Sequence, residues 1–271
     1  MTKELNETLA KFTFDWMKKG DRINPMYVRK FISIAQYYEG LEEYLKTIHF
    51  ISFNKYEYEP LTGCLTFSLK DLLKNYYEVG CMYKWEETAR DLAEYFFVNA
   101  YILHELEHIN DFKRCFEKRE NVKTRICKYC YNTEIRYRKA KTFQEKLYWL
   151  KKDKQKEKIY QKNYDASPLE HFANLNSLIE LIKMADFLEV QELKNYYLYK
   201  LYENLIESYE KRKSPTFYYL KRIGYSEEAR KLKEKESTYS FNKRINLGLS
   251  ITDEEQEVLK RTLYDKITWF E

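Results

Sequence analysis

Glycine and proline are scarce in this sequence, which has 6 Gly and 4 Pro among 271 residues. Few breakers, together with abundant Lys, Glu and Leu, favour helices over a sandwich of short strands joined by many turns. Long apolar runs are also missing: the longest, residues 95–103, is too short to cross a bilayer and is interrupted by Asn99. The sequence therefore predicts a mostly helical protein without a membrane-spanning segment.

A secretion signal is not evident in residues 1–16, which carry acidic side chains and lack a basic start followed by an apolar core. The five cysteines are an odd number, and their spacing is not that of a disulfide framework. We therefore expect a cytoplasmic protein with reduced thiols and no membrane partner.

The cysteines carry one weak motif, the CxxC pair Cys127 and Cys130. With Cys115 this pair could contribute to a structural zinc site, but a fourth ligand is missing nearby, so unpaired thiols are the favoured interpretation. Cys64 and Cys81 are expected to lie in the core.

The first part of the chain is predicted to be helical. Apolar residues at helical spacing predict a helix over 3–18. Asn24 and Pro25 are typical of an N-cap followed by proline in the first turn, and they predict a second helix that reaches residue 39. Gly40 interrupts this pattern, and we expect the helix to resume as far as about residue 47.

Residues 48–69 differ from the rest, because β-branched and aromatic residues there partly alternate with polar ones. Pro60 and Gly63 separate two such runs, which predicts a hairpin or a small antiparallel sheet. A long helix follows over 84–112 and has a strongly apolar C-terminal half. The expected fold class is α+β, mostly α.

The segment 113–162 contains 18 Lys or Arg residues and 6 Asp or Glu residues, a net charge of +12. The whole chain carries +5, so the remainder is at −7. Aromatic residues are interleaved with the basic ones, and residues 143–160 are predicted to be helical. The segment could bind phosphates and stack on bases, bind an acidic protein, or be a solvated helical arm whose rings pack on the body. The expected basic patch consists of Lys151, Lys152, Lys154, Lys156 and Lys158.

The sequence HELEH, at residues 104–108, lies inside the helix predicted over 84–112. Residues four apart face the same side of a helix, so His104 and His108 can bind one Zn²⁺ together. Glu105 then flanks the open coordination position, where it can take a proton from a water whose pKa the metal lowers to about 7. This is the minimal machinery for amide hydrolysis. The alternative is an amphipathic helix whose polar edge happens to carry these residues.

A catalytic zinc needs a third protein ligand. The best candidate is Glu170, on the first turns of a helix predicted to begin at Ser167 and Pro168. His171 is the second candidate, and a helix packed on the first would present only one of the two. Tyr164 and His171 are candidate donors to the oxyanion of the tetrahedral intermediate.

Together, HELEH at 104–108 and EHFAN at 170–174 resemble the motifs of the ImmA/IrrE family of metallopeptidases. The resemblance covers roughly residues 48–185 and implies a zincin-like helical core. Because that family is known for cleaving helix-turn-helix repressors, it also implies a transcriptional repressor as substrate. The zinc ligands and the general base that it implies are His104, His108, Glu170 and Glu105, in that order.

Two features depart from the family pattern. Glu107 stands where the family usually has glycine, and inside the core it would crowd or charge the site. We therefore expect Glu107 to point to solvent or to pair with a base from 113–162. That basic segment also makes the gap between the two motifs longer than is usual in the family.

Zincins commonly bind a substrate as an added strand at the edge of a small sheet near the metal. We expect the edge strand here to be formed by Cys64, Leu65, Thr66 and Phe67.

The predicted organisation has three regions: N-terminal helices 1–47, a metallopeptidase core 48–185 with the basic insert 113–162, and a helical region 186–271. In the last region, Ser226 and Thr252 resemble helix N-caps. The leading hypothesis is a zinc-dependent endopeptidase that cleaves a specific intracellular protein. The alternative is a non-catalytic binding or regulatory protein whose insert docks on nucleic acid or on an acidic protein.

Overall fold

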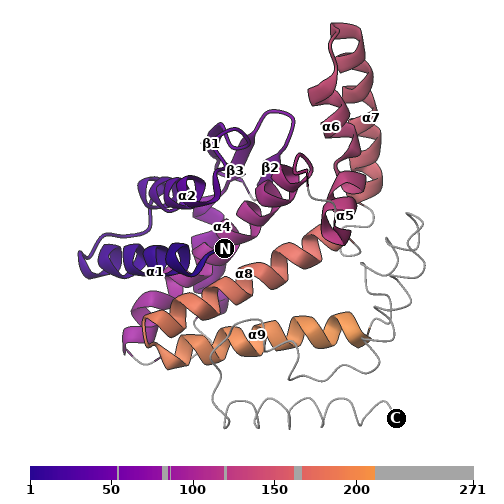
Figure 1. The fold of residues 1–271 in the computed structure, drawn as a ribbon. Helices are drawn as coiled ribbons and strands as arrows, with labels where there is room; N and C mark the ends of the chain where they lie inside the picture. The colour runs from indigo at the N-terminus through magenta and orange to yellow at the C-terminus, as the bar shows by residue number, and fades with distance from the viewer. Residues whose placement is uncertain (54, 81–84, 86, 119–120, 162–166, 211–271) are drawn as a thin grey trace.

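The computed structural model describes residues 1–53, 55–80, 85, 87–118, 121–161 and 167–210 (Figure 1). These residues are mostly helical and include a small sheet, which confirms the expected fold class of α+β, mostly α. Cys81, Tyr164, Ser226 and Thr252 lie outside the described residues. In chain order the elements are α1 (Lys3–Lys18), α2 (Pro25–Glu39), β1 (Thr47–Phe50), β2 (Tyr56–Glu59), β3 (Cys64–Phe67), α3 (Leu69–Gly80), α4 (Glu87–Arg114), α5 (Val122–Cys130), α6 (Asn132–Lys139), α7 (Phe143–Gln161), α8 (Pro168–Phe187) and α9 (Gln191–Glu210).

The second helix, α2, begins and ends where the local sequence predicts. The side chain of Asn24 accepts hydrogen bonds from the N–H groups of Met26 and Tyr27, at 2.9 and 3.0 Å, and proline occupies the first turn. Gly40 ends the helix with φ +59°, a left-handed conformation that glycine adopts without a steric penalty.

The expected resumption of helix to about residue 47 is wrong. The N–H groups of Lys46 and Thr47 donate to the carbonyl oxygen of Gly63, at 2.7 and 3.3 Å, and β1 begins at Thr47. Backbone donors that bond to the turn before β3 are not available to a helical ladder, so the chain enters the sheet at this point.

The sheet has the order β1-β3-β2. The pair β2 and β3 is the expected antiparallel hairpin, whereas β1 pairs parallel to β3. The prediction of an entirely antiparallel sheet is therefore wrong. The chain reverses direction at β2 and again at β3, so β1 and β3 run the same way.

The prediction that Cys64, Leu65, Thr66 and Phe67 form an edge strand is also wrong. They form β3, which is the central strand, with β1 on one side and β2 on the other. A strand that is hydrogen-bonded on both sides cannot accept an added peptide. The edges that remain are β1 and β2.

Helix α4 is the long helix predicted over 84–112, and it packs against α1, α2, α3, β2, α5, α8 and α9. Asn99, the polar residue in its apolar half, is fully buried. Its side chain accepts a hydrogen bond from the Tyr27 hydroxyl at 2.9 Å and donates one to the Thr13 hydroxyl at 3.2 Å. This network joins α4 to α2 and α1, so the asparagine that shortens the apolar run connects three helices.

One hydrophobic cluster extends from Leu5 in α1 to Leu201 in α9. Helix α3, which the sequence pattern had not indicated, begins directly after Ser68, whose hydroxyl donates to the Asp71 carboxylate at 2.7 Å. Across the described residues, no helix combines the length and the apolar character that a membrane crossing demands.

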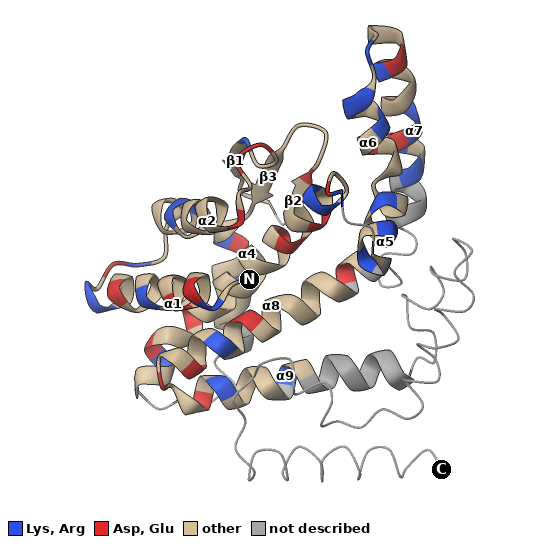
Figure 2. Cartoon of the chain, in the orientation of Figure 1, with Lys and Arg blue, Asp and Glu red and all other residues tan. Residues whose placement is uncertain are grey.

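The basic insert folds into α5, α6 and α7, of which α6 and α7 lie side by side and project from the body (Figure 1). Helix α7 confirms the helix predicted over 143–160. Figure 2 marks the Lys and Arg residues in blue, and several of them lie along this arm. Tyr131 packs on Phe112 of α4, with ring centroids 5.2 Å apart, whereas Phe143 and Tyr148 are 72% and 53% exposed. Part of the aromatic content therefore packs on the body and part faces solvent.

Candidate metal centre

The two sequence motifs meet where α8 packs against α4. His104 and His108 lie one turn apart on α4, and their Nε2 atoms are separated by 3.1 Å. Glu170, in the first turn of α8, places Oε2 at 3.2 Å from Nε2 of His104 and Oε1 at 3.2 Å from Nε2 of His108. The two imidazole nitrogens and the Glu170 carboxylate thus form a triangle of groups 3.1–3.2 Å apart, in which each nitrogen faces a different carboxylate oxygen.

The size of this triangle fits a tetrahedral metal ion. Bonds of 2.0–2.1 Å to a tetrahedral zinc place neighbouring ligand atoms about 3.3–3.4 Å apart. The side chains of His104, His108 and Glu170 are 15%, 11% and 8% exposed, so the three donors are largely withdrawn from water. His₂Glu is also a ligand set of catalytic zinc, in which a fourth position stays open for water or substrate. These three residues could hold such an ion.

Similarity to known proteins does not add to this geometry. Comparison of the chain with models of protein families, with curated proteins and with solved structures finds no match. The case for a metal centre therefore depends on the side chains of the site themselves.

Glu105 lies beside the triangle and is 5% exposed. Its ligand atom and those of His104 and His108 all lie within 4.8 Å of one another, and its carboxylate accepts a hydrogen bond from the backbone of Tyr58 in β2. Burial raises the pKa of Glu105, although the two histidines and the Tyr58 hydrogen bond act in the opposite direction. A buried carboxylate with a raised pKa, placed beside the two histidines, is suited to accept a proton during a reaction.

Glu170 has a strong effect on the pKa of His108. Burial lowers the pKa of the imidazole, but the hydrogen bond and the negative charge of Glu170, with smaller contributions from Glu105 and Asp111, raise it to about 9. The site therefore favours positive charge at the position that the imidazoles and carboxylates surround.

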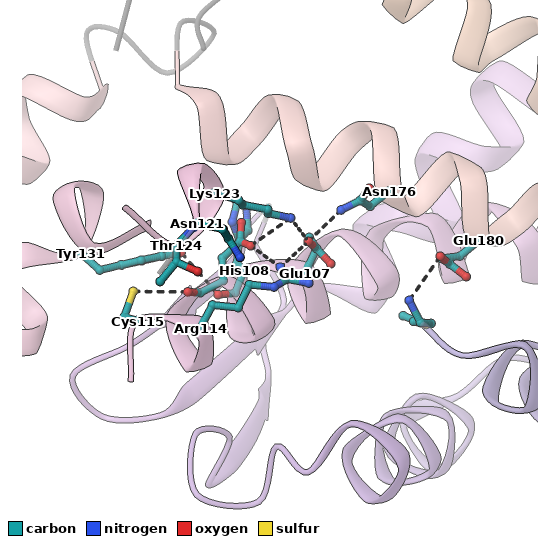
Figure 3. Close-up of polar contacts among 12 residues, drawn as sticks. Glu107, His108, Arg114, Cys115, Asn121, Lys123, Thr124, Tyr131, Asn176 and Glu180 are labelled. Atoms are coloured by element: carbon teal, nitrogen blue, oxygen red, sulfur yellow. Dashed lines mark hydrogen bonds and ion pairs between the residues drawn. The ribbon is translucent and has the colours of Figure 1, made fainter. Parts of the chain in front are cut away.

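Glu107, the departure from the family motif, pairs with bases from the insert as expected (Figure 3). It is 6% exposed, and its Oε1 lies 2.8 Å from Arg114 Nη1 and 2.6 Å from Lys123 Nζ. Burial by itself would raise the pKa of Glu107, but these two cations outweigh burial and lower it. The negative charge of Glu107 beside the candidate metal centre is thus balanced locally.

Four carboxylates are buried in this region, and they form two groups. Glu107 and Asp111 contact Arg114 and Lys123, so two negative charges meet two positive ones. The other two carboxylates, Glu105 and Glu170, lie around the histidines. A divalent cation between the imidazoles would balance the charge of that second group.

Sequence analysis missed the part played by Tyr58. Its contribution to the site is a backbone N–H, which carries no residue-specific signal, so only the packing of β2 on α4 could reveal it. Of the candidate oxyanion donors, Tyr164 lies outside the described residues, as does the side chain of His171, whose backbone belongs to α8.

The cysteines do not form a second metal site among the residues that the structure describes. The described cysteines are free thiols, and the only group of three close ligand atoms found among described residues is the one at His104. Cys115 donates to the carbonyl oxygen of Asp111 at 3.3 Å, as a structural thiol does. Cys64 is half-buried in β3, so its expected place in the core is only partly correct.

Proposed function

We propose that the chain is a zinc-dependent endopeptidase that cleaves a specific protein, with a transcriptional repressor as the substrate implied by the motif resemblance. The observation that carries this proposal is the triangle of His104, His108 and Glu170, with Glu105 beside it. Two residues of one helix and one of another supply a catalytic zinc ligand set, and the glutamate next to them has the place of a general base.

In this mechanism, His104, His108 and Glu170 would hold the zinc ion. When bound, zinc lowers the pKa of water to about 7 and polarises the substrate carbonyl. Glu105 accepts a proton from the attacking water and then delivers it to the leaving amide nitrogen. The backbone N–H of Tyr58 favours the ionised form of the Glu105 carboxylate, which accepts the proton, and burial of that carboxylate favours its protonated form midway through the reaction.

In this proposal the substrate peptide binds along β2. Strand β2 is at an edge of the sheet, packs on α4 and contacts Glu105 through Tyr58. An extended peptide added near this edge would be held by main-chain hydrogen bonds within reach of the general base.

Metal content of the purified protein tests the proposal directly. Wild-type protein should retain stoichiometric zinc after dialysis, and His108→Ala should lose it because a ligand is removed. His49→Ala is the matched control, since His49 is an exposed histidine of β1. Wild type that takes up no zinc, or a His108→Ala variant that retains it fully, would rule out the assigned centre.

The arm formed by α6 and α7 supports a second function, binding of single-stranded nucleic acid. Exposed rings of Phe143 and Tyr148 lie on a helix that also exposes basic side chains, and the Arg136 guanidinium lies 4.9 Å from the Trp149 ring centroid. Aromatic rings that can stack on bases, interspersed with basic side chains, are typical of surfaces that bind single-stranded nucleic acid. The exposed lysines of the predicted patch are Lys151, Lys152 and Lys154.

Two lysines of the predicted patch are not among these exposed residues. Lys156 lies 2.6 Å from the Glu134 carboxylate, and its side chain is 35% exposed, so it connects α7 to α6 instead of belonging to an open patch. The side chain of Lys158 is outside the described residues.

Binding of a labelled oligonucleotide tests this second function. Replacement of Lys151, Lys152 and Lys154 by serine should weaken binding and reduce its dependence on salt, whereas His104→Ala should leave binding intact. Binding of an acidic peptide but not of the oligonucleotide would assign the arm to protein recognition instead.

A further inference from the structure

A cluster of buried charges lies directly beside the proposed metal ligands and is centred on Glu107 (Figure 3). One oxygen of this carboxylate receives three donors: Arg114 Nη1 at 2.8 Å, Lys123 Nζ at 2.6 Å and Asn176 Nδ2 at 2.7 Å. The Glu107 side chain is 8% exposed, so each of these contacts is largely shielded from water. Hydrogen bonds between ionised partners in such surroundings are stronger than those between neutral groups.

Asp111 belongs to the same cluster. Its side chain is fully buried, and its Oδ1 contacts Arg114 Nη1 and lies 3.2 Å from Lys123 Nζ. The cluster therefore contains two carboxylates and two cations, and both cations contact both carboxylates. Loss of Lys123 would leave two buried carboxylates with Arg114 between them, a destabilising excess of negative charge.

The members of the cluster come from three different helices. Glu107 is the immediate neighbour of His108 on α4, Asn176 belongs to α8, which also carries Glu170, and Lys123 belongs to α5 of the insert. The hydrogen bond between Glu107 and Asn176 thus joins the two helices whose separation sets the distance from Glu170 to the histidines. The Lys123 ammonium also lies 5.1 Å from the ring centroid of Phe172 on α8.

We propose that Glu107, Lys123 and Asn176 are positioning residues of the metal centre, so that the basic insert contributes to metal affinity through Lys123. This inference rests on the proposed function, because it concerns the same centre. None of the three supplies a ligand atom to the triangle. They act by holding α4 and α8 at the separation at which His104, His108 and Glu170 converge, as residues behind the ligands do in metal sites generally.

Metal affinity of Lys123→Met tests the proposal. Titration with Co²⁺ and Zn²⁺ against a competing chelator should show binding weakened about 10–100-fold, the usual effect of changing a residue behind a metal ligand. The visible absorption of bound Co²⁺ should also change, because the ligands no longer meet in the same geometry. Lys123→Arg keeps the charge and should restore most of the affinity.

The matched control is Lys183→Met. Lys183 also pairs with a buried glutamate, Glu180 at 3.3 Å, and its side chain is 27% exposed compared with 29% for Lys123. It lies on α8 outside the Glu107 cluster, so the variant should bind Co²⁺ as wild type does. Equal weakening in Lys123→Met and Lys183→Met would show a general loss of stability and overturn the proposal.

Asn176→Ala provides a test that leaves all charges of the cluster in place. It removes the hydrogen bond from Asn176 of α8 to Glu107 of α4. The variant should bind Co²⁺ more weakly, while its circular dichroism and unfolding midpoint stay close to those of wild type. If wild type binds metal and both Lys123→Met and Asn176→Ala bind it equally tightly, the positioning role is wrong and the metal centre stands. If wild type binds neither ion, both proposals are wrong.

Discussion

The carboxylate of Glu170 lies 3.2 Å from the Nε2 atom of His108, across the interface of α4 and α8. The whole basic insert lies between these two residues in the sequence, yet the chain returns so that the first turn of α8 faces the middle of the histidine motif. This meeting turns a helix with two histidines into a candidate metal centre. It also explains why the insert can be long without separating the motifs in space.

The role of Glu105 is testable by the isosteric change Glu105→Gln. The variant should retain zinc, since the assigned ligands are untouched, and should lose about 10²–10⁴-fold in peptide cleavage because the proton acceptor is gone. New protein N-termini in cells that express wild type, but not Glu105→Gln, would identify the substrate. Glu42→Gln, at an exposed position outside the sheet, is the control and should cleave like wild type. Undiminished cleavage by Glu105→Gln would contradict the mechanism.

The turn before β3 should not tolerate a side chain at Gly63. This glycine has φ +68°, and a Cβ added there would lie 2.7 Å from the carbonyl oxygen of Tyr44. Gly20 has φ +72° with open space around it, so Gly20→Ala should cost only the conformational penalty of about 1–2 kcal/mol. Gly63→Ala should lower the free energy of unfolding in urea by clearly more, because backbone must also move. Equal losses would show that the contact with Tyr44 is unimportant.

The buried network around Asn99 should contribute measurably to stability. Asn99→Leu removes one buried hydrogen-bond partner from each of the Tyr27 and Thr13 hydroxyls, which still contact each other at 3.1 Å, and we expect a loss of about 1–3 kcal/mol in the free energy of unfolding. Asn195→Ala, at an exposed position of α9, should change it by no more than about 0.5 kcal/mol. A variant Asn99→Leu as stable as wild type would mean that added apolar contact replaces the network.

The thiols of the insert region should react slowly in the folded protein. Burial raises the pKa of Cys130 to about 12 and also raises the pKa values of Cys115 and Cys127. Because alkylation proceeds through the thiolate, little of which forms at pH 8, labelling by iodoacetamide should be much slower in native protein than in urea. A background with Cys64 and Cys81 replaced by serine isolates the three. Equally fast labelling in the native state would show that these thiols are accessible and ionised.

The sequence predicted those features that depend on neighbouring residues. Asn24, Pro25 and Gly40 set the ends of α2, because capping and proline chemistry act within one turn of the chain. The spacing of His104 and His108 placed both on one face of α4, because the helical repeat fixes which residues share a side.

The errors in the sheet have a different origin. Strand β3 was recognisable from its alternating pattern, but the pattern is the same for an edge strand and a central strand. Its position between β1 and β2 depends on hydrogen bonds from backbone that is distant in the sequence. These include the bonds that the Gly63 carbonyl oxygen accepts from the N–H groups of Lys46 and Thr47. The same limitation concealed the N–H of Tyr58, which reaches Glu105 only because β2 packs on α4.

By itself, then, the sequence determined the long helices α1, α2, α4, α7 and α8, the caps of α2 and the side chains that can carry metal chemistry, since these follow from interactions a few residues apart. Only the tertiary structure decided that Glu170 faces His108, that Lys123 neutralises Glu107 and that Asn176 joins α8 to α4. Those contacts form when distant apolar faces are buried together, and the energy of that burial depends on the assembled core and not on any local segment.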